Sequence, residues 1–135
     1  MNDVQSKIPR VCVKALFRCG EYVLYVKNPN GVRDIPGGHV EFGEDTMTAL
    51  KRELKEELGY ELTGEPVLYD VWTYLNDEKT AHRVNIIYLI DLPTRTPFYF
   101  VEDQQGAELV WLHKSEIREQ HFLPAMEHYL LQAVS

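Results

Sequence analysis

Three glutamates near the middle of the chain are spaced as a metal-binding cluster requires. Glu53, Glu56 and Glu57 follow an i, i+3, i+4 pattern, which places their side chains on one side of an α-helix. Carboxylates gathered in this way repel one another, so a cation is needed to offset their charge. Mg²⁺ fits this need, because it binds oxygen ligands, takes few carboxylates and shares its remaining positions with substrate phosphates. The spacing therefore indicates metal-assisted chemistry at a phosphate.

A helix must position these acids, and the neighbouring residues predict one. Apolar residues repeat at helical spacing, and the stripe they form is Met47, Leu50, Leu54 and Leu58. Asp45 or Thr46 can cap the start, and Gly59 stands where a left-handed residue would end the helix. The glutamates flank this stripe and therefore lie at the edge of the core. For the helix alone, an ordinary solvated acidic flank is the competing interpretation.

A glycine-containing loop precedes the helix and favours the metal-binding interpretation. Residues 35–38 read Ile-Pro-Gly-Gly, and Gly43 stands before Glu44 at the expected start of the helix. Such residues form turns, and glycine lets the backbone approach a ligand or a metal closely. Arg52 can reach Glu56 from one turn earlier, but one cation cannot neutralise three carboxylates.

The region from Gly38 to Tyr60 resembles the signature of the Nudix hydrolases. The resemblance is carried by Gly38, Glu44 and the run RELKEELG at residues 52–59. Tyr60 departs from it, because the family has a bulky aliphatic residue there. The resemblance implies one Nudix hydrolase domain over residues 1–135, with its core at about residues 9–134. The implied fold is an α/β/α sandwich with a mixed sheet between helices.

The same resemblance implies metal-dependent hydrolysis of a pyrophosphate bond in a nucleoside diphosphate linked to another group. Glu53, Glu56 and Glu57 match the metal-binding glutamates, with Mg²⁺ or Mn²⁺ as the ion, and the carbonyl of Gly38 can add an oxygen. Arg52 matches the arginine that orients the glutamates through salt bridges.

The signature does not decide which residue is the general base that activates water. Glu53 and Glu56 compete for the role within the signature. Some family members use an acid from a loop outside it, for which Glu102, Asp103 and Glu108 are the candidates here. For these three, ordinary surface charge is the alternative interpretation.

Four residues are candidates for contact with the rest of the substrate. Arg33 precedes the glycine loop, Arg83 begins an apolar run, and Trp72 and Tyr74 share one face of an expected strand. Plain surface positions for the arginines, and core or dimer contacts for the aromatic residues, are the alternatives. Asp34 stands where many family members carry an aromatic residue, so substrate choice does not transfer from those relatives.

Composition limits the classes of partner. The chain has 135 residues, a net charge of −7 and a sequence pI near 5.2, which argues against binding a nucleic-acid polymer. We expect a small nucleotide-type substrate, since a bound metal can reverse the local charge. The sequence shows neither a signal peptide nor a membrane span. We therefore expect a cytoplasmic protein in which Cys12 and Cys19 are reduced. The sequence leaves open whether the protein forms a homodimer.

The order of expected elements is strands, helix, strands, helix, which predicts an α/β fold. The expected strands are residues 11–17, 22–26, 32–35, 60–62, 67–75, 82–91, 98–101 and 108–112. A short helical segment is expected at 113–119 and a closing helix at 124–134, after a loose lead-in at 1–8.

Two other classes of function remain. A non-catalytic module that binds or senses a nucleotide would share the fold without turnover. A structural domain stabilised by Ca²⁺ or Mg²⁺ is the third interpretation, and the absence of an EF-hand loop argues against it.

Overall fold

The computed structural model describes residues 8–135, so nearly all of the expected lead-in lies outside the described residues. The strands are β1 (Arg10–Cys19), β2 (Tyr22–Lys27), β3 (Arg33–Asp34), β4 (Gly37–His39), β5 (Val67–Leu75), β6 (His82–Asp91) and β7 (Glu108–His113). The helices are α2 (Thr46–Leu58), the 3-10 helix η1 (Lys114–Gln120) and α3 (Pro124–Ala133).

The strands form one mixed sheet of seven strands. Its main path runs β3-β2-β1-β6-β5, while β4 pairs with β1 and β7 pairs with β2. The pairing of β1 with β6 is parallel and continuous from Arg10↔Arg83 to Arg18↔Asp91. The other pairings are antiparallel. Strand β1 therefore lies at the centre and holds both halves of the chain together.

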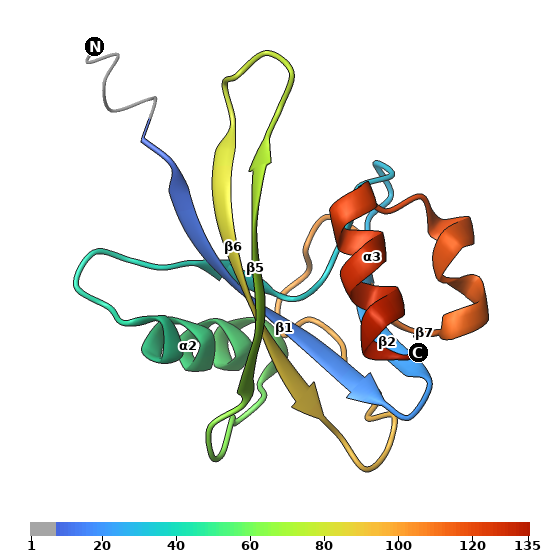
Figure 1. Ribbon diagram of the computed structural model, residues 1–135. Coiled ribbons are helices and arrows are strands. Elements are labelled where there is room, and N and C mark those ends of the chain that lie inside the picture. Colours follow the sequence, from blue (N-terminus) through green and yellow to red (C-terminus); the bar gives the residue numbers. More distant parts are fainter. Residues whose placement is uncertain (1–7) are drawn as a thin grey trace.

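Helices cover both faces of the sheet, which confirms the predicted α/β sandwich with a mixed sheet between helices (Figure 1). On one face, Ala15 and Phe17 of β1 pack with Leu50 and Leu54 of α2. On the other face, Leu16 packs in a second cluster that includes side chains of η1 and α3. Successive residues of β1 point to opposite faces, so one strand supplies both cores.

Helix α2 begins and ends with the predicted caps. The Asp45 side chain accepts a hydrogen bond from the Thr48 N–H, and Gly59 has φ 64°, in the left-handed region. The Gly59 N–H donates to the Lys55 carbonyl at 3.0 Å and the Tyr60 N–H to the Leu54 carbonyl at 3.2 Å, as expected of this type of helix end. Leu50, Leu54 and Leu58 are buried, whereas Met47 is half-buried.

Two predicted short strands, at 60–62 and 98–101, are wrong. Both segments are irregular and pair with no strand. Tyr60 instead turns its ring against Phe17 and Phe98, with ring centroids 5.2 and 5.7 Å apart. Their apolar residues cover the core around α2 from loops, which the sequence pattern could not distinguish from strands.

The predicted strand at 32–35 is shorter than expected, and the glycine loop is partly a strand. Only Arg33 and Asp34 pair with β2. Gly37, Gly38 and His39 then pair with β1 as β4. The backbone therefore crosses close to β1 at this point, and a Cβ on Gly37 would lie 2.0 Å from the carbonyl oxygen of Val13.

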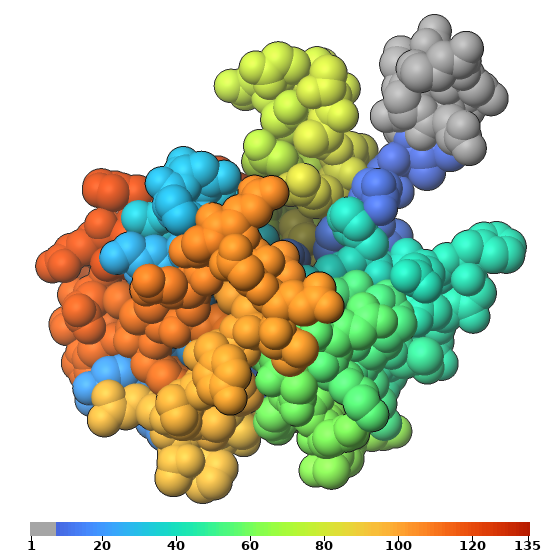
Figure 2. All heavy atoms as spheres, turned by 180° about the vertical axis from the view of Figure 1, so that it is seen from behind, coloured from blue at the N-terminus to red at the C-terminus, as the bar shows by residue number. Residues whose placement is uncertain are grey.

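The hairpin of β5 and β6 extends beyond the rest of the sheet at its turn (Figures 1 and 2). An irregularity between Leu68 and Asp70 shifts the register of β5 by one residue. Tyr69 and Trp72 consequently both pack against the cluster around α3, although alternation predicts opposite faces for them. No helix among residues 8–135 is both long and apolar enough to cross a membrane.

We expect Gly59→Ala to destabilise the protein. Its φ of 64° places residue 59 in the left-handed region, which costs an L-residue about 1–2 kcal/mol. A Cβ there would meet only Val101 Cγ2 at 3.6 Å, so the loss would come from the backbone alone. The measurement is the free energy of unfolding in urea.

Gly59→Asn is the matched control, because asparagine tolerates this conformation better than alanine. The asparagine variant should lose less stability than the alanine variant. Equal stability of Gly59→Ala and the wild type would contradict the assignment of Gly59 as a left-handed cap.

Candidate functional site

Gly38 lies directly against the carboxylate of Glu53. Gly38 is fixed in β4 by its pairing with Val13 of β1, and Glu53 projects from α2 towards it. A Cβ built on Gly38 would lie 2.3–2.5 Å from the three carboxyl atoms of Glu53, far inside contact distance. Only glycine at this position leaves room for the carboxylate, so the loop and the helix together hold it in place.

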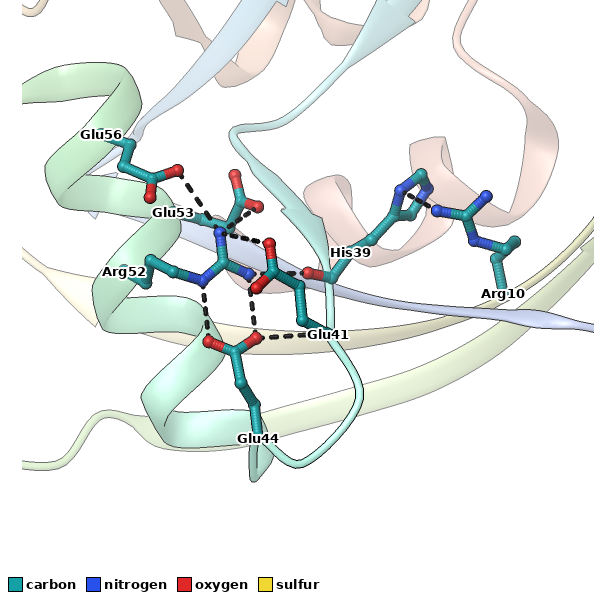
Figure 3. A network of polar contacts seen from close by, with 7 residues as sticks. All are labelled: Arg10, His39, Glu41, Glu44, Arg52, Glu53 and Glu56. Carbon is teal, nitrogen blue, oxygen red and sulfur yellow. Dashed lines mark hydrogen bonds and ion pairs between the residues drawn. The ribbon is translucent and has the colours of Figure 1, made fainter.

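Arg52 joins the loop to the helix (Figure 3). Its Nε and Nη2 donate to the two carboxylate oxygens of Glu44 at 2.7 and 2.9 Å. Nη2 also donates to the His39 carbonyl at 3.0 Å. The hydrogen bonds from Arg52, together with one from the Glu41 N–H, lower the pKa of Glu44 to about 2. Glu44 therefore stays ionised and serves as an anchor for Arg52.

The remaining nitrogen of Arg52 faces the signature acids. Its Nη1 lies 2.9 Å from Glu53 Oε1, 3.4 Å from Glu56 Oε2 and 3.7 Å from Glu41 Oε1. The bonds to Glu44 and Glu53, opposed by desolvation, raise the pKa of Arg52 above its usual value. Arg52 Nη1 is therefore within ion-pair distance of Glu53, Glu56 and Glu41.

Glu57 is half-buried, like Glu53, whereas Glu56 is exposed. Burial, and then the hydrogen bond and charge of Glu53, raise the pKa of Glu57 to about 8. It lines a cavity of about 490 Å³ together with Lys14, Asp34 and Asp103. A pKa raised in this way means that the surrounding protein disfavours the ionised form of the carboxylate. Carboxylates with such a raised pKa are typical of functional sites.

The structure only partly gathers the predicted metal ligands. Glu53 and Glu57 lie close together, whereas the Glu56 side chain is 62% exposed and points to Arg52. Among residues 8–135, no three His, Cys, Asp or Glu side chains form a preassembled metal site. Two close carboxylates beside a backbone with no side chain at Gly38 suit a hard cation that completes its shell with water and phosphate oxygens. The donor set therefore fits a hard divalent cation.

Of the three acids predicted outside the signature, only Asp103 reaches a cavity near the glutamates. It lines the same cavity as Glu57, while Glu102 and Glu108 are exposed and do not line it. Asp103 Oδ1 also accepts a hydrogen bond from the Gly106 N–H at 3.2 Å. The loop that carries it packs on the turn at residues 28–31, where a Cβ on Gly106 would lie 3.2 Å from Pro29.

A second cavity, of about 640 Å³, gathers all four predicted substrate residues. Arg33, Trp72, Tyr74 and Arg83 line it together. Arg83 is the cross-strand partner of Tyr74, and its guanidinium carbon lies 5.9 Å from the Tyr74 ring centroid. The two cavities share the lining residues Lys14, Val32, Asp34 and Gly37. They therefore adjoin along the segment that leads from β3 into β4.

Sequence reasoning missed several residues of this second cavity. Asn85 lines it from the middle of β6 and is only 4% exposed. Lys14 lines both cavities and donates to Asp34 Oδ2 at 3.0 Å. His39 lines the second cavity, and burial followed by the charges of Arg10, Arg83 and Lys14 lowers its pKa. Asn85 carried a signal, because it is a lone amide inside the apolar run VNIIYLI.

Comparison with known proteins agrees with this geometry. The NUDIX domain profile matches residues 7–134, which is nearly the whole chain. The chain belongs to the Nudix family. The signature region that suggested the family is therefore part of a match that includes the sheet and the closing helix.

The Nudix chain also resembles solved structures and one curated protein. A MutT NUDIX hydrolase from Burkholderia pseudomallei is 27% identical with a TM-score of 0.75, covering 93% of this chain and 98% of that one. The E. coli dihydroneopterin triphosphate pyrophosphohydrolase is 17% identical with a TM-score of 0.73, covering 94% and 97%. An ADP-ribose pyrophosphatase from Methanocaldococcus jannaschii is 30% identical over 88 residues, which are 62% of this chain. The match spans only about half, 52%, of that relative's length.

We expect Glu44→Gln to remove a pH-dependent part of the stability. The folded-state pKa of Glu44, about 2, lies below its ordinary value of 4.5. Its contribution is therefore complete above about pH 4.5 and is lost as the pH falls towards 2. The difference in free energy of unfolding between wild type and Glu44→Gln should be largest near neutral pH and shrink with acidification.

Glu78→Gln, in the exposed turn between β5 and β6, is the control for loss of one surface charge. Urea unfolding of the three proteins across this pH range gives the comparison. If the difference between Glu44→Gln and wild type does not change with pH, Glu44 does not form the ion pair that we describe.

Proposed function

We propose that this Nudix protein hydrolyses a pyrophosphate bond in a nucleoside diphosphate linked to another group, with a divalent metal ion. The observation that carries the proposal is the position of Glu53. Its carboxylate is held between Gly38 and Arg52, next to the half-buried Glu57. This arrangement holds two carboxyl groups close together despite their mutual repulsion, and a divalent ion with a diphosphate is its natural complement.

The residues have separate roles in this proposal. Glu53 and Glu57 hold the ion, with Glu56 and the Gly38 carbonyl as further oxygen ligands. Arg52 orients Glu53 and Glu56 and acts as a positioning residue. Mg²⁺ or Mn²⁺, when bound, neutralises charge on the phosphate oxygens and makes bound water more acidic. Lys14, which lines both cavities, offers a cation to the diphosphate.

The general base is proposed among Glu53, Glu56 and Asp103. Glu56 is largely exposed and free to change rotamer, whereas Asp103 shares a cavity with Glu57. Both can therefore approach a water near the metal. Glu102 and Glu108 are less suited, because neither lines this cavity.

The part of the substrate beyond the diphosphate is proposed to occupy the second cavity. Arg33, Trp72, Tyr74 and Arg83 provide aromatic surface and positive charge there. The curated relative is named an ADP-ribose pyrophosphatase, so ADP-ribose belongs in the panel of test compounds. Nucleoside triphosphates, nucleotide sugars and dinucleoside polyphosphates complete it.

The alternative function is a module that binds a nucleotide without cleaving it. One observation separates the two functions: a binding module would have a higher melting temperature with a nucleotide but would release no product.

A location in the cytoplasm and a homodimer are further proposals. Exposed Val67, Val71 and Leu75 on the edge strand β5 support a dimer, since apolar side chains gain from burial between subunits.

We expect Glu57→Gln and Glu56→Gln each to lower turnover of the best substrate by at least about a hundredfold, the usual effect of removing a metal ligand or a general base. Released phosphate or nucleoside monophosphate is measured with Mg²⁺ and with Mn²⁺. Glu65→Gln, an exposed acid beyond the helix, is the control and should retain wild-type turnover.

Near-normal turnover of Glu57→Gln, in a variant whose circular dichroism and melting temperature match wild type, would show that the site is misassigned. No turnover of any panel compound by the wild type would instead favour the binding module.

Asp103→Asn separates the two candidate positions of the base. If Asp103 takes the proton from water, kcat should fall by at least about a hundredfold with little change in KM. Glu108→Gln is the matched control, since Glu108 is a nearby acid outside the cavity. A kcat for Asp103→Asn within a few-fold of wild type would assign the base to the signature helix.

A further inference from the structure

The polar groups of the second cavity are mainly hydrogen-bond donors. Arg33, Trp72 and Arg83 present only N–H groups, and all three line the cavity. Asp34 is the acid in its lining, and it already accepts from Lys14 at 3.0 Å. A ligand that fills this space therefore meets many donors and few free acceptors.

Two of these residues carry buried N–H groups that have no hydrogen-bond partner. Arg33 Nε and Nη1 and the Trp72 indole Nε1 have essentially no access to solvent and no hydrogen-bond partner. A buried donor left unpaired costs about 1–3 kcal/mol, and more when it is charged. The residues are held there by the fold, because Arg33 pairs with Lys27 of β2 and Trp72 pairs with Asn85 of β6. Acceptors on a ligand would recover this cost.

Asn85, on β6, lies between Trp72 on β5 and the central strand β1. It is 4% exposed and lines the cavity. An amide offers one donor group and one acceptor in a single plane. Asn85 can therefore form hydrogen bonds with the edge of a planar ring that presents both an acceptor and a donor.

The remaining walls favour a planar ring over a phosphate group. Trp72 and Tyr74 bring aromatic surface, and Leu123 and Met126 bring aliphatic surface from the start of α3. Aromatic and apolar walls with a few convergent polar groups are typical of sites for heterocycles. A phosphate would gain from Arg33 but would leave the apolar walls unused.

We propose that this cavity selects a nucleobase whose edge is rich in acceptors, of the 6-oxopurine type found in guanine, and that Asn85, Arg33 and Trp72 determine this choice. The inference rests on the proposed function only in assuming a nucleotide substrate. Guanine presents O6 and N7 as adjacent acceptors, whereas adenine presents one acceptor and the N6 donor. With adenine, the N6 donor would face the donors of Arg33 or Trp72 and leave them unpaired.

The test measures binding apart from hydrolysis. Calorimetric titration of the full-length protein with GMP, IMP and AMP compares bases that differ at the purine 6-position. GMP and IMP should bind at least about tenfold more tightly than AMP, the discrimination expected from a matched pair of hydrogen bonds. Inorganic phosphate is titrated alongside, to show how much of the affinity comes from the phosphate alone.

Trp72→Phe is the sharpest variant, because it removes the indole N–H and keeps an aromatic ring. It should reduce the preference for GMP over AMP by about fivefold or more, while AMP affinity changes little. Asn85→Leu, of similar volume, should reduce the preference as well, and the melting temperature reports whether it folds. Val71→Thr, on the exposed face of the same strand, is the matched control and should keep wild-type preference.

Several outcomes would overturn the proposal. Equal affinities for GMP and AMP, affinity matched by inorganic phosphate, or no binding of any monophosphate would each do so. A preference for GMP that survives in both Trp72→Phe and folded Asn85→Leu would remove these residues from the recognition of the base. A protein that binds GMP selectively but cleaves nothing would refute the proposed hydrolysis and leave this inference standing.

Discussion

The site depends on one guanidinium that joins two segments of the chain. Arg52 on α2 donates to Glu44 and to the His39 carbonyl on the preceding segment, and its third nitrogen holds Glu53. The two hydrogen bonds to Glu44 fix the plane of the guanidinium. The orientation of this plane determines where Nη1 points and therefore where the Glu53 carboxylate can bind it. Without this contact, the loop and the helix would each be ordered but would not define the position of a carboxylate.

The same contact explains the requirement for glycine at residue 38. The pairing of β4 with β1 brings this backbone against α2, and the Glu53 carboxylate occupies the space of a side chain. The Glu53 carboxylate is thus held by the ion pair with Arg52 on one side and by close packing against Gly38 on the other. Burial and the neighbouring Glu53 make ionisation of Glu57 costly. The fold accepts that cost, which is the usual relation between stability and function at such sites.

The central strand β1 decides how the two cavities are arranged. Its antiparallel pairing with β4 carries the glycine segment, and its parallel pairing with β6 brings Asn85 and Arg83 alongside. Lys14 on β1 lines both cavities. The proposed chemistry and the proposed recognition of the base are therefore placed by one strand, at a spacing that a small nucleotide could span.

The sequence by itself determined the helix, its caps and the identity of the acids, because these follow from local spacing and from residue types within about one turn. It also indicated the mixed α/β fold and the family. It did not determine that Glu56 turns outward while Glu57 is half-buried, that loops at 60–62 and 98–101 replace strands, or that Asn85 joins Trp72 and Arg33 around one cavity. Those features depend on contacts between residues far apart in the chain. The strand pairings from β3 through β2, β1 and β6 to β5, together with the packing of helices and loops on the sheet, bring such residues within reach, so the tertiary structure alone could decide them.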